Sequence, residues 1–136
     1  KVYMDQTIKF CRKSGYVNNI FGRKSHFLNI NDKNYNVRNF QERAAINAPI
    51  QGSASEIMRL AMIRLSKKLD SKNNSKTKML LQIHDELIFE AHKNEEKTIS
   101  KIIIDEMSGV AKSEQHSFSI PLTVDLNTGN NWGALH

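Results

Sequence analysis

The sequence is poor in cysteine, in proline and in long apolar runs, and it has one tryptophan. Because Cys11 is the only cysteine, an intrachain disulfide is excluded, which is typical of a protein from a reducing compartment. No apolar run approaches the roughly 20 residues that a membrane-spanning helix needs, and no signal peptide is visible. We therefore expect a cytoplasmic protein without a membrane partner.

Acidic residues are the minority among the charged ones. The chain has 20 Lys and Arg against 14 Asp and Glu, a net charge of +6 at pH 7 and a pI of about 9.5. This excess favours a polyanionic partner such as nucleic acid. The 136 residues suffice for one domain or part of one. Since the chain starts at Lys1 without an initiator methionine, and its first residues are helical in pattern, we interpret it as a fragment of a longer polypeptide.

Hydrophobic periodicity predicts an α+β fold, in which helices pack on one face of a small antiparallel sheet. Helices are expected at residues 2–12, 37–48, 53–70 and 94–110. Strands are expected at residues 16–17, 26–28, 79–83, 87–91 and 122–126. Polar loops are expected at residues 29–36, 71–76 and 112–119, and Trp132 is expected to pack the tail against the domain.

Several residues predict where helices start and stop. Gly15 stands where a helix C-cap glycine is favoured. Pro49 lacks a backbone donor and is expected to end or kink the helix that precedes it. Ser53 and Glu56 have the spacing of a capping box, and Asn94 is a favoured N-cap.

A polar segment at residues 82–86 separates two apolar runs, residues 79–81 and 87–89. The runs read as buried strands, so His84, Asp85 and Glu86 fall on a hairpin turn with two carboxylates at its tip. None of the three is a preferred turn residue. Carboxylates held on strands suit Mg²⁺, which binds one or two of them together with substrate phosphates. The alternative is an ordinary polar turn, which any hairpin needs. Adjacent strand residues also point to opposite faces, so Asp85 and Glu86 can share one metal only if the turn departs from strand geometry.

Arg43, Asn47 and Gln51 recur every four residues, so on a continuous helix they form one stripe of N–H donors. The minor groove of DNA presents acceptors at nearly the same places in every base pair. A stripe of this kind suits a surface that tests base-pair geometry without reading sequence. The alternative is a solvated helix face.

Two long segments resemble the family A DNA polymerases, of which bacterial DNA polymerase I is a member. Residues 42–54 (ERAAINAPIQGSA) are similar to one family signature, and residues 81–90 (LQIHDELIFE) are similar to its third polymerase motif. Shorter segments at residues 15–17, 21–24 and 129–132 also resemble the family, in the same order. The resemblance covers nearly the whole chain and implies the C-terminal part of the palm subdomain. Residues 1–36 would then be the end of the connection from fingers to palm.

The resemblance implies a role for each matched residue. Asp85 resembles the palm carboxylate that holds catalytic Mg²⁺, and Glu86 resembles its less critical neighbour. His84 is similar to the residue beside the primer terminus. The family's minor-groove contacts to primer–template DNA correspond to Arg43, Asn47 and Gln51.

Two parts that the family needs are missing from this sequence. No segment resembles the one with the pattern DYSQIE, which supplies the other metal-binding Asp, and no fingers helix for the incoming deoxynucleoside triphosphate is found. We therefore expect the fragment alone to be inactive and, with its sheet incomplete, to form a non-native oligomer. The resemblance implies a DNA-directed DNA polymerase of replication and repair, located at the nucleoid.

Two other functions remain open. One is a non-catalytic nucleic-acid-binding module in which the carboxylates are structural. The other is a metal-dependent phosphoesterase, for which His84 is the one candidate base. The lysines near residues 67–78 fit phosphate contacts or a solvated basic loop.

Overall fold

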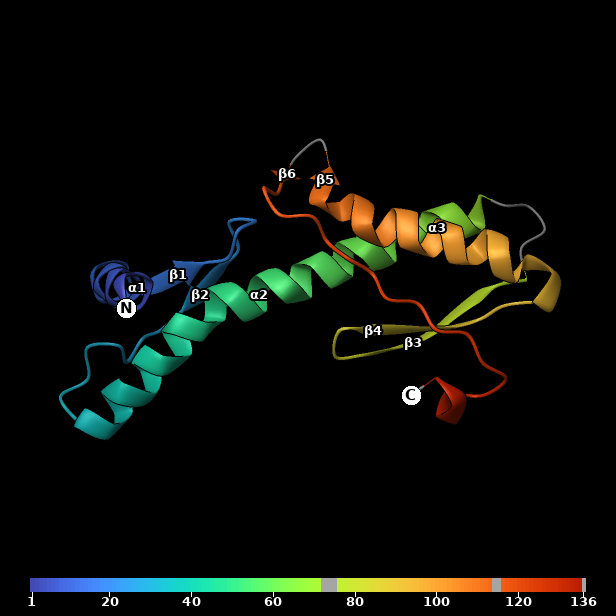
Figure 1. The fold of residues 1–136 in the computed structure, drawn as a ribbon. Helices are drawn as coiled ribbons and strands as arrows, with labels where there is room; N and C mark the ends of the chain where they lie inside the picture. Colours follow the sequence, from blue (N-terminus) through green and yellow to red (C-terminus); the bar gives the residue numbers. More distant parts are fainter. Residues whose placement is uncertain (72–75, 114–115, 136) are drawn as a thin grey trace. The chain divides into compact units, whose positions relative to one another are not determined.

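The computed structural model describes residues 1–71, 76–113 and 116–135 (Figure 1). Its helices and strands confirm the α+β class, but the described strands form three separate two-stranded antiparallel sheets instead of one. The helices are α1 (Val2–Ser14), α2 (Tyr35–Asp70) and α3 (Glu96–Ser108). The sheets pair β1 (Tyr16–Asn18) with β2 (Lys24–His26), β3 (Lys78–Ile83) with β4 (Glu86–Glu90), and β5 (Lys112–Ser113) with β6 (His116–Ser117). Short 3₁₀ turns lie at Lys93–Glu95, Gly109–Ala111 and Trp132–Ala134.

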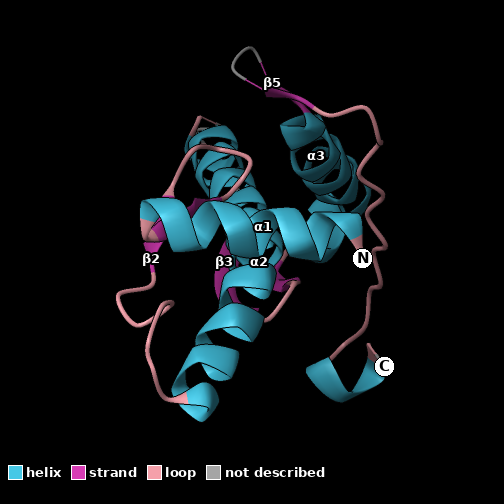
Figure 2. Cartoon of the chain, turned by 90° about the vertical axis from the view of Figure 1, so that its left-hand side faces the viewer, coloured by secondary structure: helices cyan, strands magenta, loops and turns pink. Residues whose placement is uncertain are grey.

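The chain divides into two compact units, Lys1–Glu56 and Ile57–His136, and α2 contributes to both. In the first unit α1 crosses over α2 (Figure 2). Its core consists of Cys11, Val17, Ile30 and Ala45. Burial raises the pKa of the Cys11 thiol, which fits a packing role. As predicted, α1 ends at Gly15, whose φ of 78° is a left-handed conformation that glycine adopts without strain.

The second unit packs the C-terminal part of α2 against α3. Leu65, Leu69, Ile99 and Ile103 form its core. Met79, Leu87 and Phe89 of the β3–β4 hairpin pack onto the same cluster. The helix expected at residues 94–110 is therefore present as α3, with a 3₁₀ turn at each end. No described helix is long and apolar enough to cross a membrane.

The two helices expected at residues 37–48 and 53–70 are one continuous helix, because α2 neither ends at Pro49 nor starts again at Ser53. Ser53 lies inside the helix, so the expected capping box has no helix start to cap. Ser53 Oγ instead donates to Pro49 O at 2.5 Å and accepts from Ile20 N at 3.1 Å. Glu56 pairs with Arg23 across 3.5 Å.

Asn94, the predicted N-cap of the helix at residues 94–110, does not cap α3, whose N-cap residue is Glu95. His92, not Asn94, is the N-cap of the 3₁₀ turn, and its side chain accepts from Asn94 N. Glu95 precedes α3 and accepts hydrogen bonds from Lys76 N and the Thr77 hydroxyl.

Three predictions for the C-terminal third need correction. Residues 122–126 form no strand, although their burial alternates as predicted and Leu126 packs on the second core. The predicted loop at 112–119 contains β5 and β6, and residues 114–115 lie outside the described residues. Trp132, expected to pack the tail against the domain, keeps 50% of its surface exposed. Most of the predicted loop at 71–76 also lies outside the described residues.

Candidate catalytic hairpin and nucleic-acid interface

The β3–β4 hairpin holds His84 and Asp85 in a two-residue turn. Ile83 pairs with Glu86 as the last pair before the turn, so Glu86 is the first residue of β4. The prediction that Glu86 lies in the turn is therefore wrong. The register shifts between Met79 and Leu81, where β3 carries one extra residue. Half of the Leu80 side chain is exposed, so β3 is less buried than its sequence predicts.

His84 has a φ of 50°, the one positive φ at a described non-glycine residue. Two-residue hairpin turns require such angles, and glycine or asparagine adopts them at lower cost. A left-handed residue with a Cβ costs roughly 1–2 kcal/mol. Gln82 Nε2 donates to His84 O at 3.1 Å and supports the turn. Backbone strain of this kind is concentrated at functional sites, so the choice of histidine points to a task for its side chain.

Both carboxylates of the hairpin are exposed. Leu87 packs into the core, so Glu86 lies on the opposite face of β4, while Asp85 stands at the tip. No group of three or more His, Cys, Asp or Glu suited to a metal occurs among the described residues. The hairpin therefore offers two oxygen-donor side chains. That fits Mg²⁺, which is bound by one or two carboxylates and completes its shell with water and substrate phosphate.

The stripe of Arg43, Asn47 and Gln51 exists as one surface because α2 does not stop at Pro49. All three side chains are exposed. At 1.5 Å per residue, they span about 12 Å along the helix. At 100° per residue, they are centred roughly 160° from Ala45, which is fully buried in the first core. The packing of α2 in the first unit therefore turns the stripe toward the surface.

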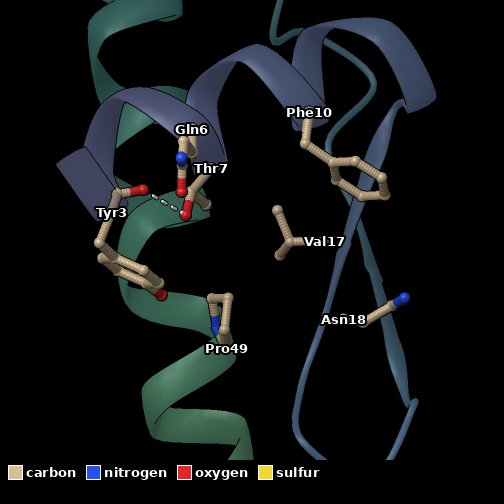
Figure 3. Close-up of a pocket in the computed structure, with 7 residues that line it drawn as sticks. All are labelled: Tyr3, Gln6, Thr7, Phe10, Val17, Asn18 and Pro49. Carbon is tan, nitrogen blue, oxygen red and sulfur yellow. Dashed lines mark hydrogen bonds between the residues drawn. The ribbon is translucent and has the colours of Figure 1, made fainter.

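The opposite face of α2 is held by contacts from α1. Arg12 forms an ion pair with Glu42. The Tyr3 hydroxyl donates to Ile46 O at 3.1 Å. Tyr3 and Pro49 line a hollow of about 290 Å³ together with Val17 (Figure 3). These contacts hold α1 against the side of α2 that carries none of the three stripe residues.

Comparison with known proteins places the chain in a family. Residues 1–134 match the sequence pattern of DNA polymerase family A. The chain belongs to this family. It is 42% identical over 132 residues to DNA polymerase I of Caldicellulosiruptor bescii and 38% identical over 132 residues to that of Bacillus subtilis. Each alignment covers 97% of this chain but only 15% and 14% of the respective relative.

A solved structure of the same family has the same fold. The POL domain of Pol1 from M. smegmatis, in complex with DNA primer-template and dNTP, superimposes with a TM-score of 0.90 at 32% identity. The match covers 98% of this chain and 23% of that one. The family A resemblance and the partial α+β polymerase fold predicted from sequence are thereby confirmed.

In this family A chain, sequence reasoning missed the residue that connects the β1–β2 turn to α2. Asn19 is 8% exposed, and its Oδ1 accepts from Phe21 N at 3.0 Å and from Arg23 N at 2.9 Å. Its Nδ2 donates to Gly52 O at 3.2 Å. Asparagine is a common turn residue, so the sequence indicates the turn but not the helix that the amide reaches.

Proposed function

We propose that the chain is the C-terminal part of the palm of a DNA-directed DNA polymerase, which adds deoxynucleotides to a primer 3′ end in DNA replication and repair. Residues 1–36 would end the connection from fingers to palm. The observation that carries the proposal is an exposed, carboxylate-bearing hairpin with a strained histidine, in a chain whose residues 1–134 belong to DNA polymerase family A. The protein would act in the cytoplasm, at the nucleoid.

Asp85 and Glu86 are the residues proposed to hold Mg²⁺ for a two-metal phosphoryl transfer. When bound, Mg²⁺ would stabilise the negative charge that develops on the transferring phosphoryl group. Asp85 at the tip of the hairpin is the principal ligand, and Glu86 on the far face of β4 is secondary. His84, which precedes Asp85 in the turn, lies beside the primer terminus in this proposal.

The stripe on α2 is proposed to contact the minor groove of primer–template DNA. Arg43, Asn47 and Gln51 present N–H donors, and every Watson–Crick pair offers minor-groove acceptors at nearly the same positions. Mispairs displace these acceptors, so the stripe would grip any correctly paired primer end. The M. smegmatis relative was solved in complex with DNA primer-template and dNTP, which supports DNA as the partner of this surface.

The chain spans 14–15% of the length of the relatives it matches, so the remaining functions would come from other segments. A second metal-binding Asp and the groups that bind the deoxynucleoside triphosphate are proposed to lie there. The fragment by itself is therefore expected to be inactive.

The proposal is tested by Asp85→Asn in the full-length protein. This change keeps the size of the side chain and removes its charge. Primer extension should fall by about a hundredfold or more, because the lost charge acts on the transition state. Primer–template affinity should stay the same. Glu90→Gln is the matched control, since Glu90 is an exposed carboxylate at the other end of β4.

Other outcomes would assign a different function. Extension by Asp85→Asn at nearly the unmodified rate would overturn the role of Asp85. DNA binding without any extension by the unmodified protein would favour a non-catalytic binding module. Mg²⁺-dependent hydrolysis of phosphoesters in place of extension would favour a phosphoesterase.

A further inference from the structure

α2 is continuous where its own sequence is weakest. Pro49 has no N–H, so Ala45 O loses its usual helical donor, and a proline inside a helix costs roughly 3 kcal/mol. Gly52 follows one turn later and is the next weakest helix former. Yet the structure carries the helix through residues 49–53. Contacts from outside α2 must therefore hold it in this conformation.

The β1–β2 turn provides these contacts on the C-terminal side of the proline. Asn19 Nδ2 donates to Gly52 O at 3.2 Å, and Ile20 N donates to Ser53 Oγ at 3.1 Å. Ser53 Oγ in turn donates to Pro49 O at 2.5 Å. The turn thus bonds to α2 at two consecutive residues, directly after the last residue of the stripe, Gln51.

The turn is itself rigid enough to act as a support. Asn19 N donates to Arg23 O at 3.0 Å, and Gly22 N donates to Asn19 O at 3.0 Å. The Asn19 side chain accepts from two further amides of the same turn. Gly22 has a φ of 81°, which lets the turn close. One side chain, nine-tenths buried, therefore organises the turn and reaches across to the helix.

We propose that Asn19 is a positioning residue, and that the β1–β2 turn acts as a splint that keeps Gln51 in line with Arg43 and Asn47. The stripe is interrupted by Pro49, with two of its residues before the proline and one after it. Without the splint, the helix loosens between residues 49 and 53, and Gln51 loses its register with the other two. This inference rests on the proposed function of the stripe as a minor-groove contact.

The test uses Asn19→Asp in the full-length protein. Aspartate keeps the oxygen that accepts from Phe21 N and Arg23 N, but it cannot donate to Gly52 O. Asn19→Ala, which removes both kinds of bond, is measured in parallel, together with thermal unfolding of every variant. Asn18→Asp is the matched control because Asn18 is its exposed neighbour on β1.

Two readouts are expected to change. Discrimination against extension of a mispaired primer end should fall by about three- to tenfold, the range that one net hydrogen bond corresponds to. Amide hydrogen exchange at residues 50–53 should accelerate by a similar factor. Asn18→Asp should change neither, and chemistry on a fully paired primer at saturating DNA should stay within about twofold in all variants.

Rescue by Pro49→Ala separates positioning from a general loss of structure. Alanine restores the missing N–H and needs no splint. In the Pro49→Ala background, Asn19→Asp should therefore have little effect on mispair discrimination or exchange, so the double-mutant cycle should show strong coupling. Equal effects of Asn19→Asp in both backgrounds would overturn the splint.

Gln51→Ala distinguishes the failure of this inference from the failure of the proposed function. If Gln51→Ala lowers discrimination but neither Asn19 variant does, the splint is wrong and the stripe stands. If Gln51→Ala has no effect, the stripe function is wrong. Amide exchange at residues 50–53 in the Asn19 variants then tests, without the stripe, whether the β1–β2 turn holds α2.

Discussion

At the scale of single residues, the proposed function depends on exposed polar side chains whose backbone is held by buried neighbours. Asp85 and Glu86 differ in this respect although they are adjacent. Asp85 occupies the turn, and Glu86 is a strand residue directed away from the core that Leu87 enters. The proposed roles of Asp85 as principal ligand and Glu86 as secondary ligand therefore follow from their backbone positions and not from residue type.

Glu86→Gln is therefore expected to reduce primer extension far less than Asp85→Asn. A secondary metal ligand can be replaced by water, which Mg²⁺ retains readily. We expect the Glu86→Gln rate to stay within about tenfold of the unmodified enzyme, against about a hundredfold or more for Asp85. Single-nucleotide extension as a function of Mg²⁺ concentration measures both. Equal losses for the two variants would contradict the assignment of Asp85 as principal ligand.

Arg43→Ala and Gln51→Ala should weaken the grip on the duplex for all sequences alike and should lower the penalty for extending a mispair. The reason is that both side chains reach acceptors that every correct pair presents and that mispairs displace. The measurement is extension from the four correct pairs and from mispaired ends at fixed Mg²⁺. Ser66→Ala, an exposed change on α2 about four turns beyond the stripe, is the control. A preference of either variant for one correct pair over another would argue against a universal minor-groove contact.

At the scale of elements, α2 contributes residues to both hydrophobic cores. Ala45 belongs to the first, and Leu65 and Leu69 belong to the second. In the second unit Leu65 is fully buried against α3, while Ile63, two positions earlier, is 39% exposed. Arg64 between them pairs with Glu106 at 3.0 Å and donates to Gly109 O at 3.3 Å. The α2–α3 contact thus combines an apolar core with a polar edge.

Leu65→Ala should lower the free energy of unfolding of this unit by about 2–5 kcal/mol, because it leaves a cavity in a packed core. Ile63→Ala should cost much less, since its side chain is already partly solvated. Amide exchange of α2 and α3 in the full-length protein measures the difference. Similar losses for the two variants would show that α3 packs on a different side of α2.

At the scale of the whole molecule, the 136-residue chain leaves much apolar surface exposed. Large side chains with more than half of their surface exposed include Leu28, Val2, Ile20, Leu80 and Ile120. In the described residues β3 pairs only with β4, so both outer edges of that hairpin are open. Open edges and apolar patches of this kind promote association.

The 136-residue chain expressed by itself is therefore expected to form dimers or larger oligomers and to incorporate no nucleotides. Light scattering at micromolar concentration, together with a hydrophobic dye, measures the first expectation, and primer extension measures the second. A clean monomer that binds little dye would contradict the first. Nucleotide incorporation would show that the chain needs no further metal-binding segment.

Local sequence was enough to determine the family, the α+β class and the identity of the candidate site residues. Residues 42–54 and 81–90 carry distinctive side chains in short, unbroken segments, so no distant contact is needed to recognise them. The C-cap at Gly15, the β3–β4 hairpin and the helix α3 were likewise predicted correctly. In each of these, local conformational preference and the observed structure agree.

Only the tertiary structure decided that α2 is continuous through residues 49–53, how the turn at His84 closes and which residues form hydrogen bonds to α2 beside the stripe. Pro49 and Gly52 favour a break, but α2 is continuous there, and the β1–β2 turn, more than 30 residues earlier, forms hydrogen bonds to Gly52 and Ser53. Residues 122–126 show the converse, because an alternating pattern forms a strand only where a partner strand supplies its hydrogen bonds. Contacts between distant segments contribute energies as large as local propensities, and a single sequence does not show which segments will meet.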